Sequence, residues 1–216
     1  MENIDKMLNC GDPSFGGAMY VCTTCHNMKF VPFRCKSRFC PTCGVKYSQE
    51  RSTRMAFKLL NCTHRHCVFT IDEELRHFFL EDRSLLNCLF RAVQSVILRM
   101  FNKMNQSQNF VPGFICVLHT FGCPLEWNPH IHCILSKGGF SDNAIWRPVK
   151  HFNYTYLRNA FQTALLNEME QHIGPSFKKI KAYIYHKDNL GFYVVSKKEM
   201  MLVSYYTKKR SDIVLN

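Results

Sequence analysis

The sequence predicts an α+β fold, in which an antiparallel sheet with flanking helices follows a small zinc-binding module. Three observations lead to this prediction. Cysteines crowd the first 43 residues, short β-branched and aromatic runs recur between residues 66 and 206, and two long helical stretches separate those runs. Hydrophobic residues make up 46% of the 216 residues, which is enough for a substantial core.

The N-terminal cysteines have the spacing of a metal site. Two Cys-x-x-Cys pairs are separated by fourteen residues, and two such pairs can place four thiolates around one tetrahedral zinc ion. Clustered cysteines in a chain without an export signal favour metal over disulfides. We therefore expect a module of residues 1–46 with a structural zinc ion held by Cys22, Cys25, Cys40 and Cys43.

Other residues of the module have no single assignment from the spacing. Cys10, Cys35 and His26 could complete a second site or replace one of the four expected ligands. Basic side chains lie among these cysteines, and a small zinc-stapled basic module is suited to nucleic acid, although it can equally dock a protein. The residues expected to contact DNA are Arg34, Lys36 and Arg38.

The elements of the second part follow in order. A linker helix is predicted at residues 47–62, because the sequence from Lys46 to Leu60 contains neither Gly nor Pro. The run 66-HCVFTI-71 predicts a strand. Residues 73–104 predict one long helix or two shorter ones, with an apolar stripe at three- and four-residue steps.

A hairpin and a mixed C-terminal region come next. Residues 113–122 and 130–139 predict two antiparallel strands, joined by a turn with two prolines. Residues 155–172 predict a helix that ends at Gly174-Pro175. Strand candidates then follow at 180–185, 190–195 and 200–206, and together residues 63–216 form the expected second domain.

Charge and composition limit the partners. The chain carries 28 Lys and Arg against 16 Asp and Glu, a net charge of +12, which favours a polyanion. Aromatic residues reach 13%, and basic groups with aromatic rings suit single-stranded nucleic acid, whose bases stack on rings. No apolar window long enough for a membrane span and no signal peptide is evident. We expect a cytoplasmic, nucleoid-associated protein, and homo-oligomer formation stays open.

The stretch 128-NPHIHCIL-135 places two histidines in an apolar run. In a strand, residues i and i+2 point to one face, so His130 and His132 point together. Two imidazoles on one face can bind a divalent metal ion. For an isolated His-x-His pair, two hydrogen-bonded core histidines are the alternative interpretation.

The wider context of these histidines resembles a known family. The stretch 118-LHTFGCPLEWNPHIHCILSKGGF-140 resembles the histidine-hydrophobe-histidine block of rolling-circle insertion-sequence transposases, the insertion-sequence ninety-one family of the HUH nuclease superfamily. The stretch 34-RCKSRFCPTCG-44 is similar to the family's N-terminal zinc-binding module. Further similarity lies in 68-VFTIDEELR-76, 83-RSLLNCLFRA-92 and 192-FYV-194, in the same order as in the family.

The resemblance implies DNA transposition by metal-dependent nicking and rejoining of single-stranded DNA at element ends. It implies that His130 and His132 hold Mg²⁺ or Mn²⁺, and that a tyrosine becomes covalently joined to the 5′ phosphate. It also implies an HUH-like sheet with flanking helices. A third metal ligand is left open among His119, His66, Glu126 and Asn128.

The family carries its nucleophile after the metal motif, as a Tyr-x-x-x-Tyr pattern or a single tyrosine. In 199-EMMLVSYYTKKRSDIVLN-216, Tyr205 takes the first position, Lys209 falls on the second and Tyr206 is the neighbouring alternative to Tyr205. Because this motif is degenerate, we expect either a nuclease with Tyr205 as its nucleophile or a shortened, non-catalytic DNA-binding remnant that lacks the nucleophile helix. A zinc-stapled protein-interaction module is a third interpretation.

Overall fold

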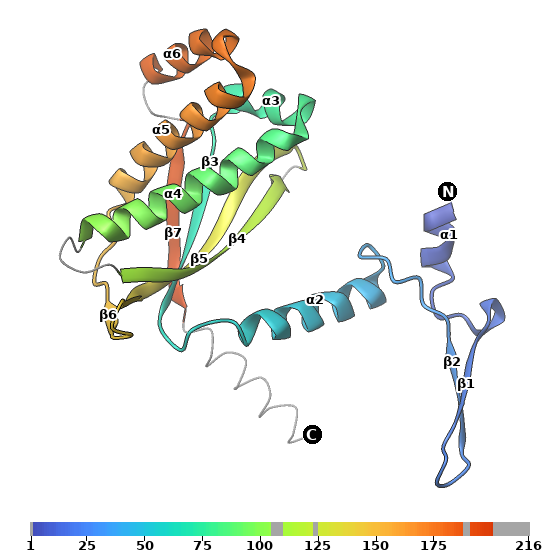
Figure 1. Ribbon diagram of the computed structural model, residues 1–216. Coiled ribbons are helices and arrows are strands. Elements are labelled where there is room, and N and C mark those ends of the chain that lie inside the picture. Colours follow the sequence, from blue (N-terminus) through green and yellow to red (C-terminus); the bar gives the residue numbers. More distant parts are fainter. Residues whose placement is uncertain (1, 105–109, 123–124, 188–190, 201–216) are drawn as a thin grey trace. The chain divides into compact units, whose positions relative to one another are not determined.

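The computed structural model describes residues 2–104, 110–122, 125–187 and 191–200 (Figure 1). The chain divides into two compact units, Met1–Leu59 and Leu60–Asn216. The first contains the cysteine-rich segment and the second contains the His-x-His segment. The predicted α+β class with antiparallel sheets is confirmed.

The second unit is built on one antiparallel sheet. Its strand order is β4-β5-β3-β7, and a short β6 pairs with the end of β5. The predicted hairpin of residues 113–122 and 130–139 is confirmed as β4 and β5, which pair along most of their length. The strands are β3 (His64–Thr70), β4 (Phe110–Phe121), β5 (Trp127–Ser141), β6 (Trp146–Pro148) and β7 (Tyr193–Met200).

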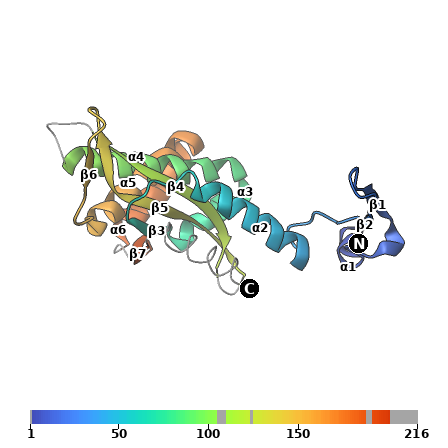
Figure 2. The same cartoon turned by 90° about the horizontal axis from the view of Figure 1, so that it is seen from below.

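Two long helices cover one face of this sheet (Figures 1 and 2). They are α4 (Leu86–Met104) and α5 (Tyr154–Ile173), and shorter helices α3 (Arg76–Glu81) and α6 (Lys178–His186) accompany them. The side chain of Asn153 caps α5 by accepting a hydrogen bond from the Tyr156 N–H at 2.9 Å. Single 3-10 turns occupy Glu73–Leu75, Arg83–Leu85 and Pro175–Phe177.

The core lies between the sheet and these helices. Along β5, Ile131, Cys133 and Leu135 are fully buried, because alternate residues of a strand point to the same face. By length and composition alone, the stretch Arg83–Met104 would suffice to cross a membrane. Its apolar stripe is instead buried in this core, at Cys88, Leu89, Ala92, Val93, Val96, Ile97, Met100 and Phe101.

One predicted strand is wrong. Residues 180–185 form part of helix α6 instead. Ile180 and Ile184 are one helical turn apart and both pack on the core, where Ile184 is only 2% exposed. The spacing of these apolar side chains therefore fits a helix, with a period of about four residues, better than a strand, with a period of two. The strand predicted at 190–195 is β7, which begins at Tyr193, whereas the candidate at 200–206 lies almost wholly outside the described residues.

The first unit holds a helix, a hairpin and a second helix. These are α1 (Glu2–Leu8), a 3-10 turn (Pro13–Phe15), β1 (Gly17–Val21), β2 (Met28–Pro32) and α2 (Pro41–Ala56). Cys40 is the residue before the first turn of α2, and Pro41 takes the first helical position, where its missing N–H costs nothing. The helix therefore begins earlier than the linker helix predicted at 47–62.

The first unit has almost no buried side chains. Among its residues 3–59, Cys40 alone is buried, with 3% of its surface exposed. A fold of this size without an apolar core needs another source of stability, and metal ions commonly supply it.

Candidate metal centres

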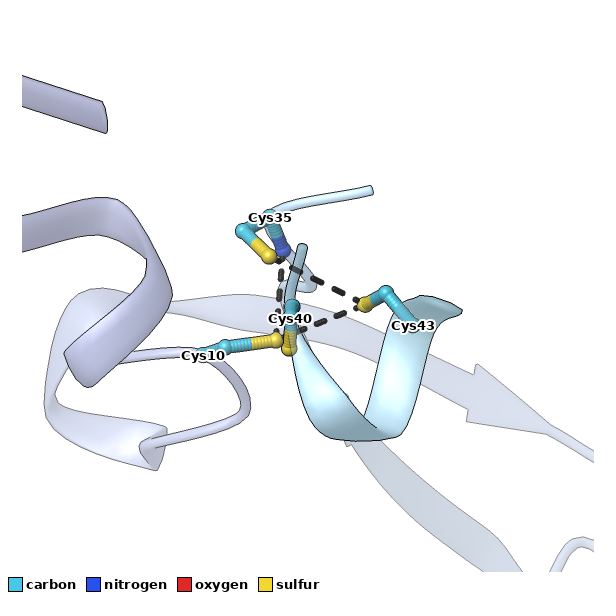
Figure 3. Close-up of side chains that lie close together, drawn as sticks. All are labelled: Cys10, Cys35, Cys40 and Cys43. Carbon is cyan, nitrogen blue, oxygen red and sulfur yellow. Dashed lines mark hydrogen bonds between the residues drawn. The ribbon is translucent and has the colours of Figure 1, made fainter. Parts of the chain in front are cut away.

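Four cysteines of the first unit converge on one point (Figure 3). Cys10 follows α1, Cys35 follows β2, and Cys40 and Cys43 lie at the N-terminal end of α2. Their four sulfur atoms lie within 4.8 Å of one another, with 3.5 Å between Cys10 Sγ and Cys43 Sγ and 3.9 Å between Cys35 Sγ and Cys43 Sγ. Four sulfurs at about 2.3 Å from a tetrahedral zinc ion would lie about 3.8 Å apart. The spacing of these sulfurs therefore fits zinc.

The electrostatics of the group also suit a cation. The backbone N–H of Cys35 donates to Cys10 Sγ at 3.4 Å and lowers the pKa of Cys10 to about 7. The N–H of Ser37 favours the Cys35 thiolate, but burial and the surrounding thiols prevail and raise the pKa of Cys35 to about 12. Close thiolates repel one another, so the four can ionise together only around a positive charge.

The structure does not group the cysteines as the sequence spacing suggested. Cys40 and Cys43 meet Cys10 and Cys35, whereas Cys22 and Cys25 are exposed in the turn of the β1–β2 hairpin. The hairpin explains this difference, because strands of five residues at about 3.3 Å per residue place the turn about 16 Å from the hairpin's base. Spacing along the chain cannot show that a hairpin separates the two pairs.

Three histidines meet on the sheet face opposite α4 and α5. His119 lies on β4, directly across from His130 on β5, and His132 is the next residue of β5 on the same face. One ligand nitrogen from each of the three lies within 4.8 Å of the others. The buried residues Ile131 and Cys133 alternate with His130 and His132 and point to the core.

Hydrogen bonds fix the orientation of the two β5 histidines. His130 Nδ1 lies 2.7 Å from the carbonyl oxygen of Asn128, and His130 Nε2 lies 3.0 Å from His132 Nε2. His132 Nδ1 in turn lies 2.8 Å from His66 Nε2, on β3. A carbonyl only accepts, so His130 carries its proton on Nδ1. With neutral rings, His132 then donates from Nε2 to His130, and His66 donates from Nε2 to His132.

Two further features favour metal binding at this group. Partial burial and the neighbouring His130 lower the pKa of His119, which favours the neutral imidazole that a metal ion needs. The Oδ1 atom of Asn128 is buried and has no hydrogen-bond partner among the described residues. The carbonyl oxygen of the same residue is the one that lies 2.7 Å from His130 Nδ1, so Asn128 is next to the group.

The remaining predicted site residues are placed as follows. Of the open alternatives for a third ligand, the structure brings His119 into the group and puts His66 behind His132, whereas Glu126 lies outside the group. Tyr205 and Tyr206 lie outside the described residues. The three basic residues predicted to contact DNA are exposed between β2 and α2, and the guanidinium of Arg38 lies 4.8 Å from the centre of the Tyr47 ring.

A third group of side chains with ligand atoms needs no metal. Cys88 is buried between α4 and α5, near Glu168 and His172. Arg91 already pairs with both of these, at 3.6 Å from Glu168 Oε2 and 3.2 Å from His172 Nε2. The arginine supplies the positive charge that a metal ion would bring.

Comparisons with known proteins found family matches in both parts of the chain. The family model described as "Transposase zinc-binding domain" matches residues 1–71, and the one described as "Putative transposase" matches residues 113–200. The transposase for insertion sequence element IS801 of Pseudomonas savastanoi pv. phaseolicola is 31% identical over 149 residues, which cover 68% of this chain and 35% of that protein. A Sinorhizobium fredii protein named "Putative transposase y4qJ" is 30% identical over 168 residues, which cover 75% of this chain and 42% of that protein.

The chain thus spans less than half the length of these curated relatives. No solved structure matches it. Two family models match in succession along the chain, one for the zinc-binding part and one for the part with the histidine group, and both relatives bear the name transposase. The chain belongs to the IS91 family of insertion-sequence transposases.

Proposed function

We propose that the chain nicks and rejoins single-stranded DNA at the ends of an insertion sequence, with a divalent ion held by His119, His130 and His132. The observation that supports this most is the meeting of three imidazoles on the sheet face opposite the helices. A pair of core histidines would need only each other. A third ring and a buried, unpartnered Asn128 oxygen beside them are better explained by a bound ion.

The geometry of the group fits such an ion. Two ligands in adjacent positions of an octahedral ion, each at about 2.1 Å, lie about 3 Å apart. The Nε2 atoms of His130 and His132 are 3.0 Å apart. Of the two expected ions, Mn²⁺ suits three nitrogen donors better, because Mg²⁺ prefers carboxylate, phosphate and water oxygens.

In this reaction the protein would hold the metal ion and orient the histidine rings that bind it. A bound ion would polarise the scissile phosphate and stabilise charge on the leaving oxygen. To coordinate through Nε2, His132 must carry its proton on Nδ1 and donate it to His66 Nε2. This proton arrangement is the reverse of the one that the hydrogen bonds of His130, His132 and His66 indicate. His66 would then hold the His132 ring, as the Asn128 carbonyl holds the ring of His130.

Tyr205 remains the proposed nucleophile, with Tyr206 as its neighbouring alternative. The tyrosine oxygen forms a bond to phosphorus, the bond from phosphorus to the 3′ oxygen breaks, and the strand leaves with a free 3′-OH. The tyrosyl ester conserves the energy of the broken bond. Attack on it by a 3′-OH restores the DNA without a nucleotide cofactor.

The first unit would bind DNA through its basic residues and hold its own shape through zinc. Cys10, Cys35, Cys40 and Cys43 are the proposed ligands of the structural zinc ion, since their sulfurs already have its spacing. Exposed cations around that group are available to phosphates, so affinity for DNA should fall steeply with salt. The proposed contacts are Arg34, Lys36 and Arg38.

The proposal is tested with the purified chain, labelled single-stranded DNA from the element's ends and Mn²⁺. A denaturing gel should show a protein-linked band that the Tyr205→Phe variant lacks. The double variant His130→Ala with His132→Ala should also lose the band, and His119→Ala should weaken it. His151→Ala is the matched control, because His151 is exposed and lies outside the group.

Two outcomes would contradict the proposal. Undiminished cleavage by the double histidine variant would remove these residues from the metal site. Salt-sensitive DNA binding without any adduct in Mn²⁺ would favour the non-catalytic DNA-binding alternative over a nuclease.

A further inference from the structure

The turn of the β1–β2 hairpin carries two exposed thiols, Cys22 and Cys25. The turn is closed by two backbone hydrogen bonds, from the Cys22 N–H to Asn27 O at 2.9 Å and from the His26 N–H to Cys22 O at 3.0 Å. His26 has φ 56°, in the left-handed region, which lets the chain reverse at this point. The four-cysteine group at the base of the hairpin is complete without these two thiols.

The turn holds its two sulfurs as one unit. Hydrogen bonding by the backbone N–H groups of Cys25 and Thr24 and by the thiol of Cys25 lowers the pKa of Cys22 to about 7. Backbone N–H groups aimed at a sulfur favour the thiolate. A Cys-x-x-Cys turn of this kind lets both sulfurs face one ion.

Two thiolates make only half of a structural zinc site, which takes four protein ligands. Among residues 3–59 of the first unit, no His, Cys, Asp or Glu offers a third ligand atom within 4.8 Å of these two sulfurs. The turn of each first unit therefore presents two donors of the four.

We propose that two copies of this chain share one zinc ion, each contributing Cys22 and Cys25. A two-fold axis through the ion brings identical turns together, as in the self-complementary interfaces of symmetric dimers. Each thiol that binds releases its proton to solvent, and four thiolates then surround the ion. This inference does not depend on the nuclease chemistry.

The surface around the turn fits a second copy better than DNA. The segment 14-SFGGAMYVCTTCHNM-28 contains no Lys, Arg, Asp or Glu, although the whole chain carries a net charge of +12. Two such turns can meet without charge repulsion, because the nearest charged side chain along β2, Lys29, lies one residue beyond this segment. Val21 and Met28, the strand pair next to the turn, are 55% and 72% exposed. Apposed turns would remove this apolar surface from water.

The test measures zinc content and mass on the full chain carrying His130→Ala with His132→Ala, under reducing conditions, after zinc loading and desalting. These two substitutions remove the proposed histidine site, which would otherwise bind zinc as well. For this reference chain we expect about 1.5 zinc ions per chain, one in each four-cysteine group and one shared, and the mass of a dimer by light scattering. Adding Cys22→Ser with Cys25→Ser, the double cysteine variant, should leave about one zinc ion per chain and a monomer. Adding Cys62→Ser removes a thiol of the second unit and should match the reference chain.

Each alternative outcome is decisive. One zinc ion per reference chain, two on a monomer, or a dimer that persists in the double cysteine variant would each overturn the shared site. If the double cysteine variant fails to fold, Co²⁺ titration of the reference chain replaces it. The absorption of Co²⁺ bound to thiolates should then saturate at about 1.5 equivalents of Co²⁺ per chain, and dimers should form only after the first equivalent has bound. Saturation at one equivalent would overturn the proposal.

Discussion

Replacing Cys35 by serine tests which cysteines stabilise the first unit. The substitution removes one of the four sulfurs that meet in Figure 3 and leaves the Cys22–Cys25 turn untouched. Structural zinc contributes about 10–16 kcal/mol to the folding of small zinc modules at neutral pH. Residues 3–59 bury only Cys40, so apolar burial cannot replace even a small part of that contribution. We expect Cys35→Ser to lose the zinc of the four-cysteine group and to unfold the module.

Limited trypsin digestion with zinc analysis provides the assay. Arg34, Lys36 and Arg38 are cleavage sites within the segment that the four-cysteine group holds. Cleavage there should be much faster in Cys35→Ser than in the wild type, while the second unit stays resistant. Cys22→Ser is the matched comparison and should keep this zinc and the slow cleavage. If Cys22→Ser loses both and Cys35→Ser keeps them, the grouping of Cys10 and Cys35 with Cys40 and Cys43 is refuted.

Three further predictions concern the second unit. Phe161→Ala should destabilise it by about 3–5 kcal/mol in urea denaturation, because this ring is fully buried, and a loss below about 1 kcal/mol would argue against that packing. Gly191→Ala should also lower the melting temperature, since an added Cβ would overlap the buried Asp72 carboxylate; an unchanged melting temperature would contradict this contact. Lys181 lowers the pKa of Glu170, so this ion pair stabilises the fold above about pH 4.5 and is lost as the pH falls through the lowered value. Glu170→Gln should therefore reduce the loss of stability between pH 5 and pH 3, measured by thermal unfolding.

Much of the second unit follows from its sequence pattern. The alternation of His130, Ile131, His132 and Cys133 is enough to place two imidazoles on one face and the apolar side chains on the other. The meeting with His119 depends on the register between β4 and β5, which the sequence alone does not give. Local pattern therefore predicted the pair, and strand pairing supplied the third ring.

The helix at 180–185 and the grouping of the N-terminal cysteines both depend on long-range contacts. For residues 180–185, the side chains fit both a period of two and a period of four, and only the core contacts of Ile180 and Ile184 decide for the helix. For the zinc module, the hairpin separates Cys22 and Cys25 from the base, where Cys10 and Cys35 approach α2. In both cases the deciding contacts join parts that are distant along the chain, beyond what spacing can encode.

The near absence of buried side chains in the first unit has a consequence for its evolution. In most domains, a change of surface recognition risks the core, because many side chains serve both. Here one cluster of sulfurs is proposed to hold the shape, and almost every other side chain of residues 3–59 is at least partly exposed. Such a module can exchange most of its side chains at little cost in folding. The surface that this module offers to a partner can therefore diverge rapidly while its architecture persists.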